Sequence, residues 1–163
     1  MIRVVPAFVV FCGAACPSLA QTSDTLLTIE LGSGTRHYDM AALKALPVQE
    51  FTTSTPWTHG PQHFAGVPVA ALLEDAGITD GAFHAVALNE YAVTMDVAAV
   101  QPDADGNGPI IAYLADGAEM TRRDKGPLWL IWPYDAAPHY RTEVVYSGSV
   151  WQLESIRHIP PAE

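Results

Sequence analysis

The most unusual stretch of this chain places three cations directly before a run of apolar and aromatic residues. Arg122, Arg123 and Lys125 lie close together, although the chain has only eight Lys and Arg residues and a formal charge of −10. The apolar run over residues 128–132 is bounded by two prolines, which is typical of a short buried strand. Cations beside aromatic faces suit a flat, polar, heteroaromatic or anionic ligand. A solvated turn that enters a core strand is the alternative interpretation.

Two other polar patterns have spacings that are known from metal sites. The loop 103–108 begins like a calcium loop, but its twelfth position is Leu114, where a bidentate Glu is required. His59 and His63 are four residues apart, but a Gly-Pro pair between them argues against the helix that a zinc site of this spacing needs. We therefore predict no metal site, and we interpret His59 as a loop residue near a ligand pocket.

The first twenty residues are typical of a secretory signal. They hold one charge, Arg3, followed by an apolar run over residues 4–15 and a small-residue cleavage site that ends at Ala20. The sequence therefore predicts a signal peptide over residues 1–20 and an exported, periplasmic protein. A lipid anchor on Cys16 is the lesser alternative, because no branched apolar residue precedes this cysteine closely.

Removal of the predicted signal changes the chemistry that is open to the chain. Both cysteines, Cys12 and Cys16, lie within the signal, so residues 21–163 have no thiol and must be stabilised by their core. The loss of Arg3 makes the remaining chain one unit more negative, and such a surface repels nucleic acid and anionic lipid headgroups. We expect a single domain over residues 21–163 that neither binds nucleic acid nor inserts into a membrane.

The order of expected elements predicts the α+β class, with a mixed and mostly antiparallel sheet and a few short helices. Strands outnumber helices, and they do not alternate strictly with them. The expected elements are a hairpin over 26–38, a helix over 40–46 after an Asp39 cap, a strand over 49–55, an exposed loop with Trp57 over 56–61, a helix over 69–76, a hairpin over 84–95 that turns at 89–90, a helical turn over 96–100, a loop over 101–109, a strand over 110–114 with a turn at 116–117, an irregular stretch around 138–141 and a last strand over 149–159.

Four segments, taken in order, resemble the sulfite oxidase molybdopterin-binding domain. They are residues 53–57 (TSTPW), 64–77 (FAGVPVAALLEDAG), 126–133 (GPLWLIWP) and 151–156 (WQLESI), and together they span most of the chain after the predicted signal. The resemblance implies the mixed α+β sulfite-oxidase fold, whose pocket in the family holds a pterin that carries molybdenum. It also implies, as one functional alternative, a molybdopterin-dependent oxidoreductase.

The chain departs from the family at the positions that hold the metal and the anion. The family's metal-binding cysteine falls at Thr53 or its immediate neighbours, and a hydroxyl is no substitute for a thiolate as a soft ligand. Trp129 stands where the family often has an Arg, and Val150 stands where it has a Lys. We therefore expect no bound molybdenum and no catalytic residue, and molybdopterin is a less favoured ligand than a free pterin.

Small exported members of this superfamily that lack the cysteine are similar to this chain. Some of them resemble periplasmic pterin-binding sensors that act through a membrane-bound cyclic-di-GMP enzyme. The resemblance thus implies a non-catalytic pterin-binding protein with the periplasmic domain of a membrane signalling protein as its partner. A structural domain without a small ligand is a third possibility. The predicted ligand site consists of residues that could stack on a pterin or bind its polar groups. They are Thr53, Thr55, Trp57, His59, Asn89, Glu90, Tyr91, Arg122, Arg123, Asp124, Lys125, Trp132, Tyr134 and Trp151.

Overall fold

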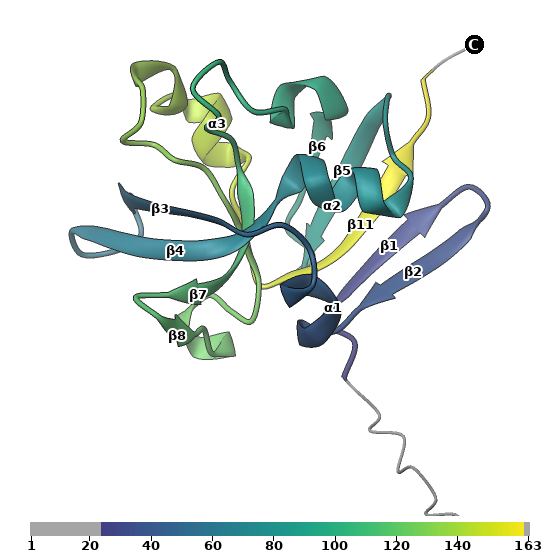
Figure 1. Ribbon diagram of the computed structural model, residues 1–163, viewed down its shortest axis with the longest axis horizontal. Helices are drawn as coiled ribbons and strands as arrows, with labels where there is room; N and C mark the ends of the chain where they lie inside the picture. The colour runs from purple at the N-terminus through teal and green to yellow at the C-terminus, as the bar shows by residue number, and fades with distance from the viewer. Residues whose placement is uncertain (1–23, 162–163) are drawn as a thin grey trace, which may run out of the picture.

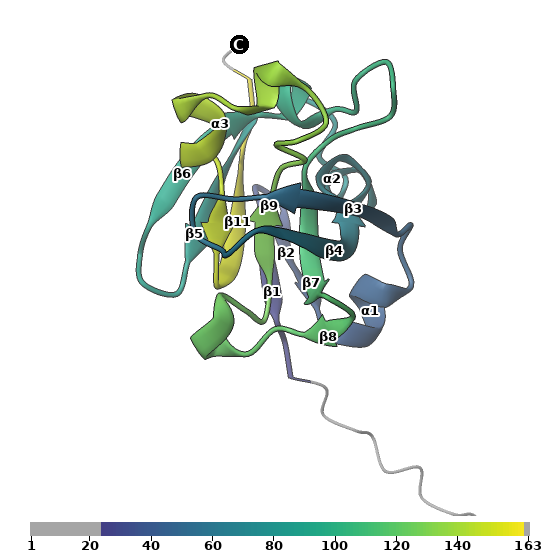
Figure 2. The same ribbon diagram turned by 90° about the vertical axis from the view of Figure 1, so that its left-hand side faces the viewer.

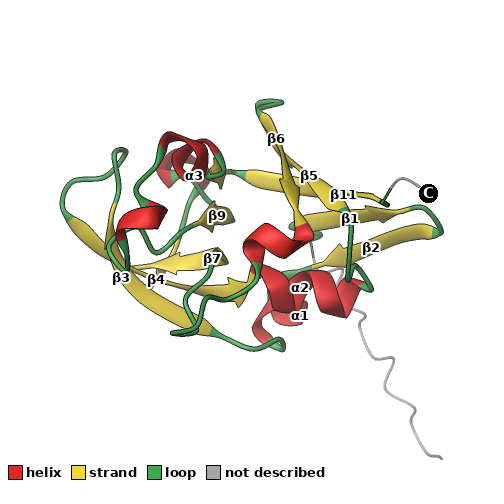
Figure 3. Cartoon of the chain, turned by 90° about the horizontal axis from the view of Figure 1, so that it is seen from above, coloured by secondary structure: helices red, strands yellow, loops and turns green. Residues whose placement is uncertain are grey.

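The computed structural model describes residues 24–161 and contains two sheets built mainly from antiparallel strands. The predicted signal peptide over residues 1–20 lies outside the described residues. Figure 3 shows the two sheets side by side, with α1 and α2 between them on one side. This arrangement confirms the predicted α+β class, with mostly antiparallel sheets and short helices.

The first sheet has five strands in the order β2-β1-β11-β5-β6. All of its neighbours are antiparallel except β1 and β11, which run parallel, with Ile29 opposite Ile156. Figure 1 shows β11, in yellow, between β1 and β5. The strands of this sheet are β1 (Leu27–Leu31), β2 (Gly34–Tyr38), β5 (Ala82–Ala87), β6 (Ala92–Asp96) and β11 (Leu153–Ile159).

The second sheet has the order β10-β9-β7-β4-β3, and β8 adds to the far end of β7. Figure 2 shows this sheet from the side on which β3 and β4 cross in front of β7 and β9. Its strands are β3 (Gln49–Ser54), β4 (Pro61–Pro68), β7 (Ile110–Ala115), β8 (Ala118–Glu119), β9 (Trp129–Ile131) and β10 (Val150–Trp151).

The helices are short, and side chains or glycines mark several of their ends. Asp39 caps α1 by accepting a hydrogen bond from the backbone N–H of Ala42, as predicted. Gly77 ends α2 in the left-handed region, with φ of 87°. The helices are α1 (Met40–Lys44), α2 (Val69–Ala76) and α3 (Glu143–Ser147), and the 3-10 turns are η1 (Val97–Val100), η2 (Arg122–Asp124) and η3 (Pro138–Tyr140). None of the helices within residues 24–161 is long and apolar enough to cross a bilayer.

The core lies between the sheets and is filled by side chains from both. Phe64, Trp129 and Phe83 are among the largest fully buried side chains. Gly66 in β4 lets this strand approach β7 closely, because a Cβ at this position would overlap the backbone carbonyl of Ile111. The close approach fixes the distance between β4 and the strands that carry the candidate site.

The predicted local elements are confirmed over most of the chain. The three hairpin turns form where the sequence predicts them, and Glu90 and Asp116 adopt the positive φ angles that tight turns need. The predicted irregular stretch around residues 138–141 is followed by α3, which the sequence analysis did not predict. Thr142 caps α3 by accepting a hydrogen bond from the N–H of Val145. Threonine is a common N-cap residue, so the sequence held a signal for this helix.

The prediction of one continuous last strand over residues 149–159 is wrong. Gln152 has φ of 52°, so the extended conformation breaks there, and the chain passes from one sheet to the other. Val150–Trp151 pairs with β9 in the second sheet, whereas Leu153–Ile159 pairs with β1 and β5 in the first. The side chain and backbone of Gln152 hold the break in place through bonds to the carbonyl oxygens of Arg122 and Lys125.

Candidate functional site

The cationic segment is held rigidly by its own backbone. The N–H groups of Asp124 and Gly126 both donate to the carbonyl oxygen of Thr121 and close the turn η2. Lys125 adopts φ of 73°, and Gly126 packs so closely on Met120 that a Cβ would overlap the Met120 backbone. Because this turn is tied to Met120 and to Gln152, the backbone positions from which its side chains extend are fixed.

A pocket of about 400 Å³ lies beside η2 and joins it to the β3–β4 loop. Figure 1 shows β8 and the turn after it below the β3–β4 hairpin on one side of the molecule. We call this the basic pocket, and its lining residues are Trp57, Thr58, His59, Gln62, Ala115, Ala118, Glu119, Met120, Arg123, Asp124, Lys125 and Trp129. The structure therefore brings together five predicted site residues from two distant segments, namely Trp57, His59, Arg123, Asp124 and Lys125.

The cations of the basic pocket have no carboxylate partner among residues 24–161. Arg123 and Lys125 form no ion pair within the described part of the chain. The carboxylate of Glu119 binds Lys44 at 2.9 Å, and that of Asp124 accepts from the Thr121 hydroxyl at 2.6 Å. Both positive charges are thus available to a ligand.

Aromatic atoms form the wall of the pocket beneath the cations. The Lys125 Nζ lies 5.8 Å from the centroid of the Trp129 ring, which is within the range of a cation–π contact. The Trp129 side chain is almost fully buried, and its indole Nε1 has no hydrogen-bond partner within residues 24–161. A buried donor without a partner is costly, so the Trp129 indole that Lys125 contacts holds an uncompensated polar atom within the described residues.

The predicted exposed position of Trp57 is wrong, because its ring is partly buried in a cluster of aromatic side chains. Its centroid lies 5.4 Å from that of Trp151, 6.1 Å from those of Trp129 and Tyr146, and 6.3 Å from that of Tyr134, all with edge-to-face geometry. We call these five residues the aromatic cluster. Its rings come from the β3–β4 loop, β9, β10, α3 and the segment after β9, so Trp57 joins the basic pocket to the core.

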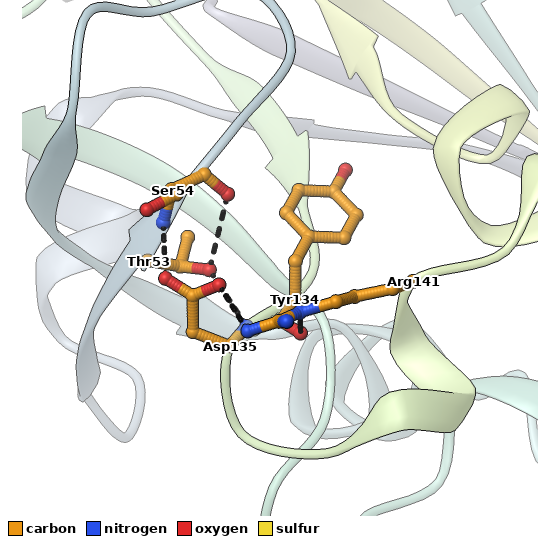
Figure 4. Close-up of polar contacts among 5 residues, drawn as sticks. All are labelled: Thr53, Ser54, Tyr134, Asp135 and Arg141. Carbon is orange, nitrogen blue, oxygen red and sulfur yellow. Dashed lines mark hydrogen bonds and ion pairs between the residues drawn. The ribbon is translucent and has the colours of Figure 1, made fainter.

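A network centred on Asp135 holds the end of β3 against the segment after β9 (Figure 4). The Asp135 carboxylate accepts from the Ser54 N–H at 2.7 Å and from Arg141 Nη2 at 2.8 Å. The Asp135 N–H donates to the Thr53 hydroxyl at 3.1 Å, and Arg141 Nε donates to the Tyr134 carbonyl at 3.0 Å. The hydrogen bond from the Ser54 N–H lowers the pKa of Asp135 most, and Arg141 adds to this against an opposing effect of desolvation.

This network leaves Thr53 unsuited to hold a metal. Its side chain is fully buried, and its hydroxyl accepts from the Asp135 N–H while it faces the Ser54 carbonyl at 3.4 Å. A buried hydroxyl with protein partners does not supply the soft, open ligand that molybdenum takes from the family's cysteine. The residues present therefore do not fit a molybdenum-pterin cofactor bound through this position.

The remaining polar residues of the predicted site do not line the basic pocket. Thr55 bonds the Thr58 hydroxyl at 2.8 Å and the Trp57 N–H at 3.1 Å, so it shapes the loop under Trp57. Arg122 lines a different pocket on the other side of η2. The tip of the β5–β6 hairpin lies apart as well, and it holds Asn89, Glu90 and Tyr91.

The remaining aromatic residues of the predicted site are largely in the core. Tyr134 is fully buried and hydrogen-bonds the Ser149 hydroxyl, and burial raises the pKa of its phenol. Trp151 belongs to the aromatic cluster. Trp132 is buried and lines a separate cavity between β6 and α3. Of the predicted stacking residues, only Trp57 lines the basic pocket.

Several residues of the basic pocket were not predicted, and for most of them the sequence offers a weak signal. Trp129 is in this group: the resemblance marks it only as a departure from the family, whereas the structure places its ring beneath Lys125. Gln62 and Glu119 are polar residues of β4 and β8, and alternation alone does not distinguish a polar residue on a pocket rim from one in solvent.

Comparison with known proteins does not assign the chain to a family. It matches no protein-family model, and no curated protein sequence matches it.

Proposed function

We propose that this protein is a non-catalytic binding protein for a pterin-like ligand that sits in the basic pocket. The observation that carries the proposal is the meeting of two unpaired cations, Arg123 and Lys125, with the Trp57 and Trp129 rings around one pocket. Its volume of about 400 Å³ falls within the range of small-molecule sites. No pair of side chains in this pocket is arranged as a nucleophile and its base, which supports binding rather than catalysis.

A pterin has a flat ring and an amino-pyrimidinone edge, and each has a matching group in the pocket. Trp57 contributes apolar surface to the wall for the flat ring. The Asp124 carboxylate lies on the same wall as the cations and has acceptor capacity for the amino edge beyond its bond to Thr121. Arg123 and Lys125 would hold the ring carbonyl or an anionic substituent.

The cellular part of the proposal rests on the N-terminal sequence and on the resemblance to the sulfite oxidase domain. We propose export to the periplasm, a sulfite-oxidase fold, and transmission of ligand occupancy to the periplasmic domain of a membrane-bound cyclic-di-GMP enzyme. A fusion of residues 1–24 to alkaline phosphatase that lacks its own signal tests export. Phosphatase activity in intact cells is expected, and its absence would contradict export.

Binding is tested with pterin-6-carboxylate, which is fluorescent and anionic. We expect saturable quenching of its fluorescence by the purified protein, and weaker binding of uncharged pterin. Arg123→Ala should weaken binding of the carboxylate by about five-fold, the upper range for an exposed ion pair, because the Arg123 side chain is exposed. Lys125→Ala should weaken it further, since Lys125 is half-buried and loses less charge to solvent screening.

The chain offers a matched control in the adjacent residue. Arg122→Ala removes the same charge one position away but from a residue that does not line the basic pocket. Affinity should be unchanged in this variant. If Arg122→Ala and Arg123→Ala lose the same affinity for pterin-6-carboxylate, the cations act only through the overall charge of the protein. If the unaltered protein does not quench the fluorescence, the proposed ligand is refuted. Stoichiometric molybdenum in protein purified from its native periplasm would favour the oxidoreductase instead.

A further inference from the structure

A second cavity, of about 510 Å³, lies between β6 and α3. Figures 1 and 2 show these two elements at the same end of the molecule. The cavity is lined by Met95 and Asp96 of β6, by Trp132 and Tyr140, and by Val145 and Gly148 at α3. It shares no lining residue with the basic pocket. We call it the α3 cavity.

The charge of the α3 cavity is opposite to that of the basic pocket. Its lining holds two carboxylates, Asp96 and Asp103, and no Lys or Arg. The Asp96 side chain has no hydrogen bond or ion pair within residues 24–161, even though it precedes η1. Arg141, which directly follows the lining residue Tyr140, is engaged by Asp135 and by the Tyr134 carbonyl. An uncompensated carboxylate thus lies at the rim of a mostly apolar space.

Asp103 stays ionised beside the same cavity. Its carboxylate accepts from the N–H groups of Asp105 and Asn107 and, at 3.0 Å, from the Tyr140 hydroxyl. Desolvation opposes ionisation, but these bonds outweigh it and lower the pKa of Asp103. Burial and the bond to Asp103 raise the pKa of Tyr140 to about 12, so its phenol remains a donor. The negative charge therefore persists behind the Tyr140 ring.

The walls of the α3 cavity are polarizable and aromatic. The centroids of the Trp132 and Tyr140 rings lie 6.0 Å apart, and those of His139 and Tyr140 lie 4.1 Å apart with the two rings tilted. Trp132 is more than nine-tenths buried, and its Nε1 has no partner among the described residues. This nitrogen and the Met95 sulfur both approach Gly148, at 3.3 and 3.4 Å from the point where a Cβ would lie. A side chain at position 148 would therefore crowd the indole nitrogen and the Met95 sulfur, and glycine avoids this.

We infer that the α3 cavity is a binding site for a small organic cation with an apolar body, such as an arylalkylamine or quaternary ammonium compound. Aromatic faces attract such cations, and the carboxylate at the rim of the cavity complements their charge. The cavity is large enough for a single-ring ligand. Val144, which is 80% exposed at the same rim, extends the apolar surface outward for the ligand body.

The test uses benzyltrimethylammonium as the probe and benzyl alcohol as its neutral counterpart, at pH 7.5. The chain has four tryptophans, so its indole N–H signals are few and can be followed in a ¹H–¹⁵N correlation spectrum. The Trp132 indole signal should shift saturably when the cation is added at millimolar concentrations. The protein should bind the alcohol more weakly. Lys125→Ala should leave this titration unchanged, which separates this inference from the proposed pterin site.

Two carboxylate variants test the role of charge. Asp96→Asn should weaken cation binding by about three- to five-fold, as expected for loss of one exposed ion pair. Asp80→Asn is the matched control, because Asp80 lies two residues before Ala82, which pairs with Asp96, and yet it does not line the α3 cavity. It removes the same charge and should leave binding unchanged.

A further variant blocks the rim without touching the core. Val144→Arg places a cation on an exposed position of α3 and should reduce binding of benzyltrimethylammonium by more than Asp96→Asn does, because it adds repulsion and bulk. The amide spectrum of each variant reports whether its fold is intact. A Trp132 signal that does not move, equal affinities for cation and alcohol, or equal losses in Asp96→Asn and Asp80→Asn would each overturn the inference.

Discussion

The Asp135 network makes a quantitative prediction for the substitution Asp135→Ala. This change removes a charge-assisted bond from the Ser54 N–H at 2.7 Å, a type of bond worth about 1.5 to 3 kcal/mol. It also removes the ion pair with Arg141, whose side chain is 55% exposed, and such a pair contributes about 0.2 to 1 kcal/mol. Because Ser54 is only half-buried, water replaces part of the lost bond. We expect the free energy of unfolding to fall by about 2 kcal/mol.

Urea unfolding followed by circular dichroism measures this loss, and Arg141→Ala is its matched control. That variant loses the ion pair and the bond to the Tyr134 carbonyl but keeps the Asp135–Ser54 bond, so it should cost about 1 kcal/mol. The slope of unfolding against urea should not change in either variant. A loss of less than about 0.5 kcal/mol in Asp135→Ala would refute the reasoning, since it would mean that the network does not hold the end of β3.

The acid dependence of the same variant gives an independent check. The folded protein lowers the pKa of Asp135 below its unfolded value, which is about 3.9. The stabilisation by the carboxylate is therefore complete above about pH 4 and is lost as the pH falls through the lower folded pKa. The difference in unfolding free energy between the unaltered protein and Asp135→Ala should shrink with acidification over that range. A constant difference down to strong acid would show that the charge contributes nothing.

Three further substitutions test other parts of the fold. Gly66→Ala should destabilise the protein by about 3 kcal/mol, because its Cβ would overlap the backbone of Ile111; Gly77→Ala has open space and should cost only about 1 kcal/mol for its left-handed φ. Urea unfolding of the two variants decides this point, and a smaller loss at Gly66 than at Gly77 would contradict the close approach of β4 and β7. Asp103→Asn should be less stable than the unaltered protein near neutral pH, and the gap should narrow in acid as the low-pKa carboxylate of Asp103 is protonated. If thermal unfolding shows the same gap at pH 7 and in strong acid, the bonds to Asp103 do not favour its charged form.

The sequence predicted elements well where short-range chemistry decides the structure. Caps such as Asp39, turns such as Asp116-Gly117 and the glycine after α2 depend on neighbouring residues, so their pattern is visible without the fold. Apolar and β-rich runs also predicted most strands, but β4 (Pro61–Pro68) was not predicted. Gln152 was missed because its left-handed conformation is unusual for its residue type and depends on partners thirty residues away.

The candidate site was predicted in part, for a similar reason. The cations Arg123 and Lys125 were visible as a local cluster, and Trp57 was visible as an aromatic residue between turn-forming residues. That Trp57 would be partly buried depends on where β9, β10 and α3 place four other rings, and no local pattern encodes that. The tip of the β5–β6 hairpin was included on residue type alone, and the fold places it elsewhere.

The parallel pairing of β1 with β11 constrains how the chain can acquire its structure. Glu30 and Arg157 form an ion pair across these strands although they are 127 residues apart in the sequence. Without β11, the β1–β2 and β5–β6 hairpins have no shared neighbour, because β11 is the strand that joins them. A growing chain therefore has two separate hairpins in place of the first sheet until β11 emerges. Assembly of the first sheet must wait for the synthesis of β11, and a truncation before residue 153 should leave a chain open to proteolysis.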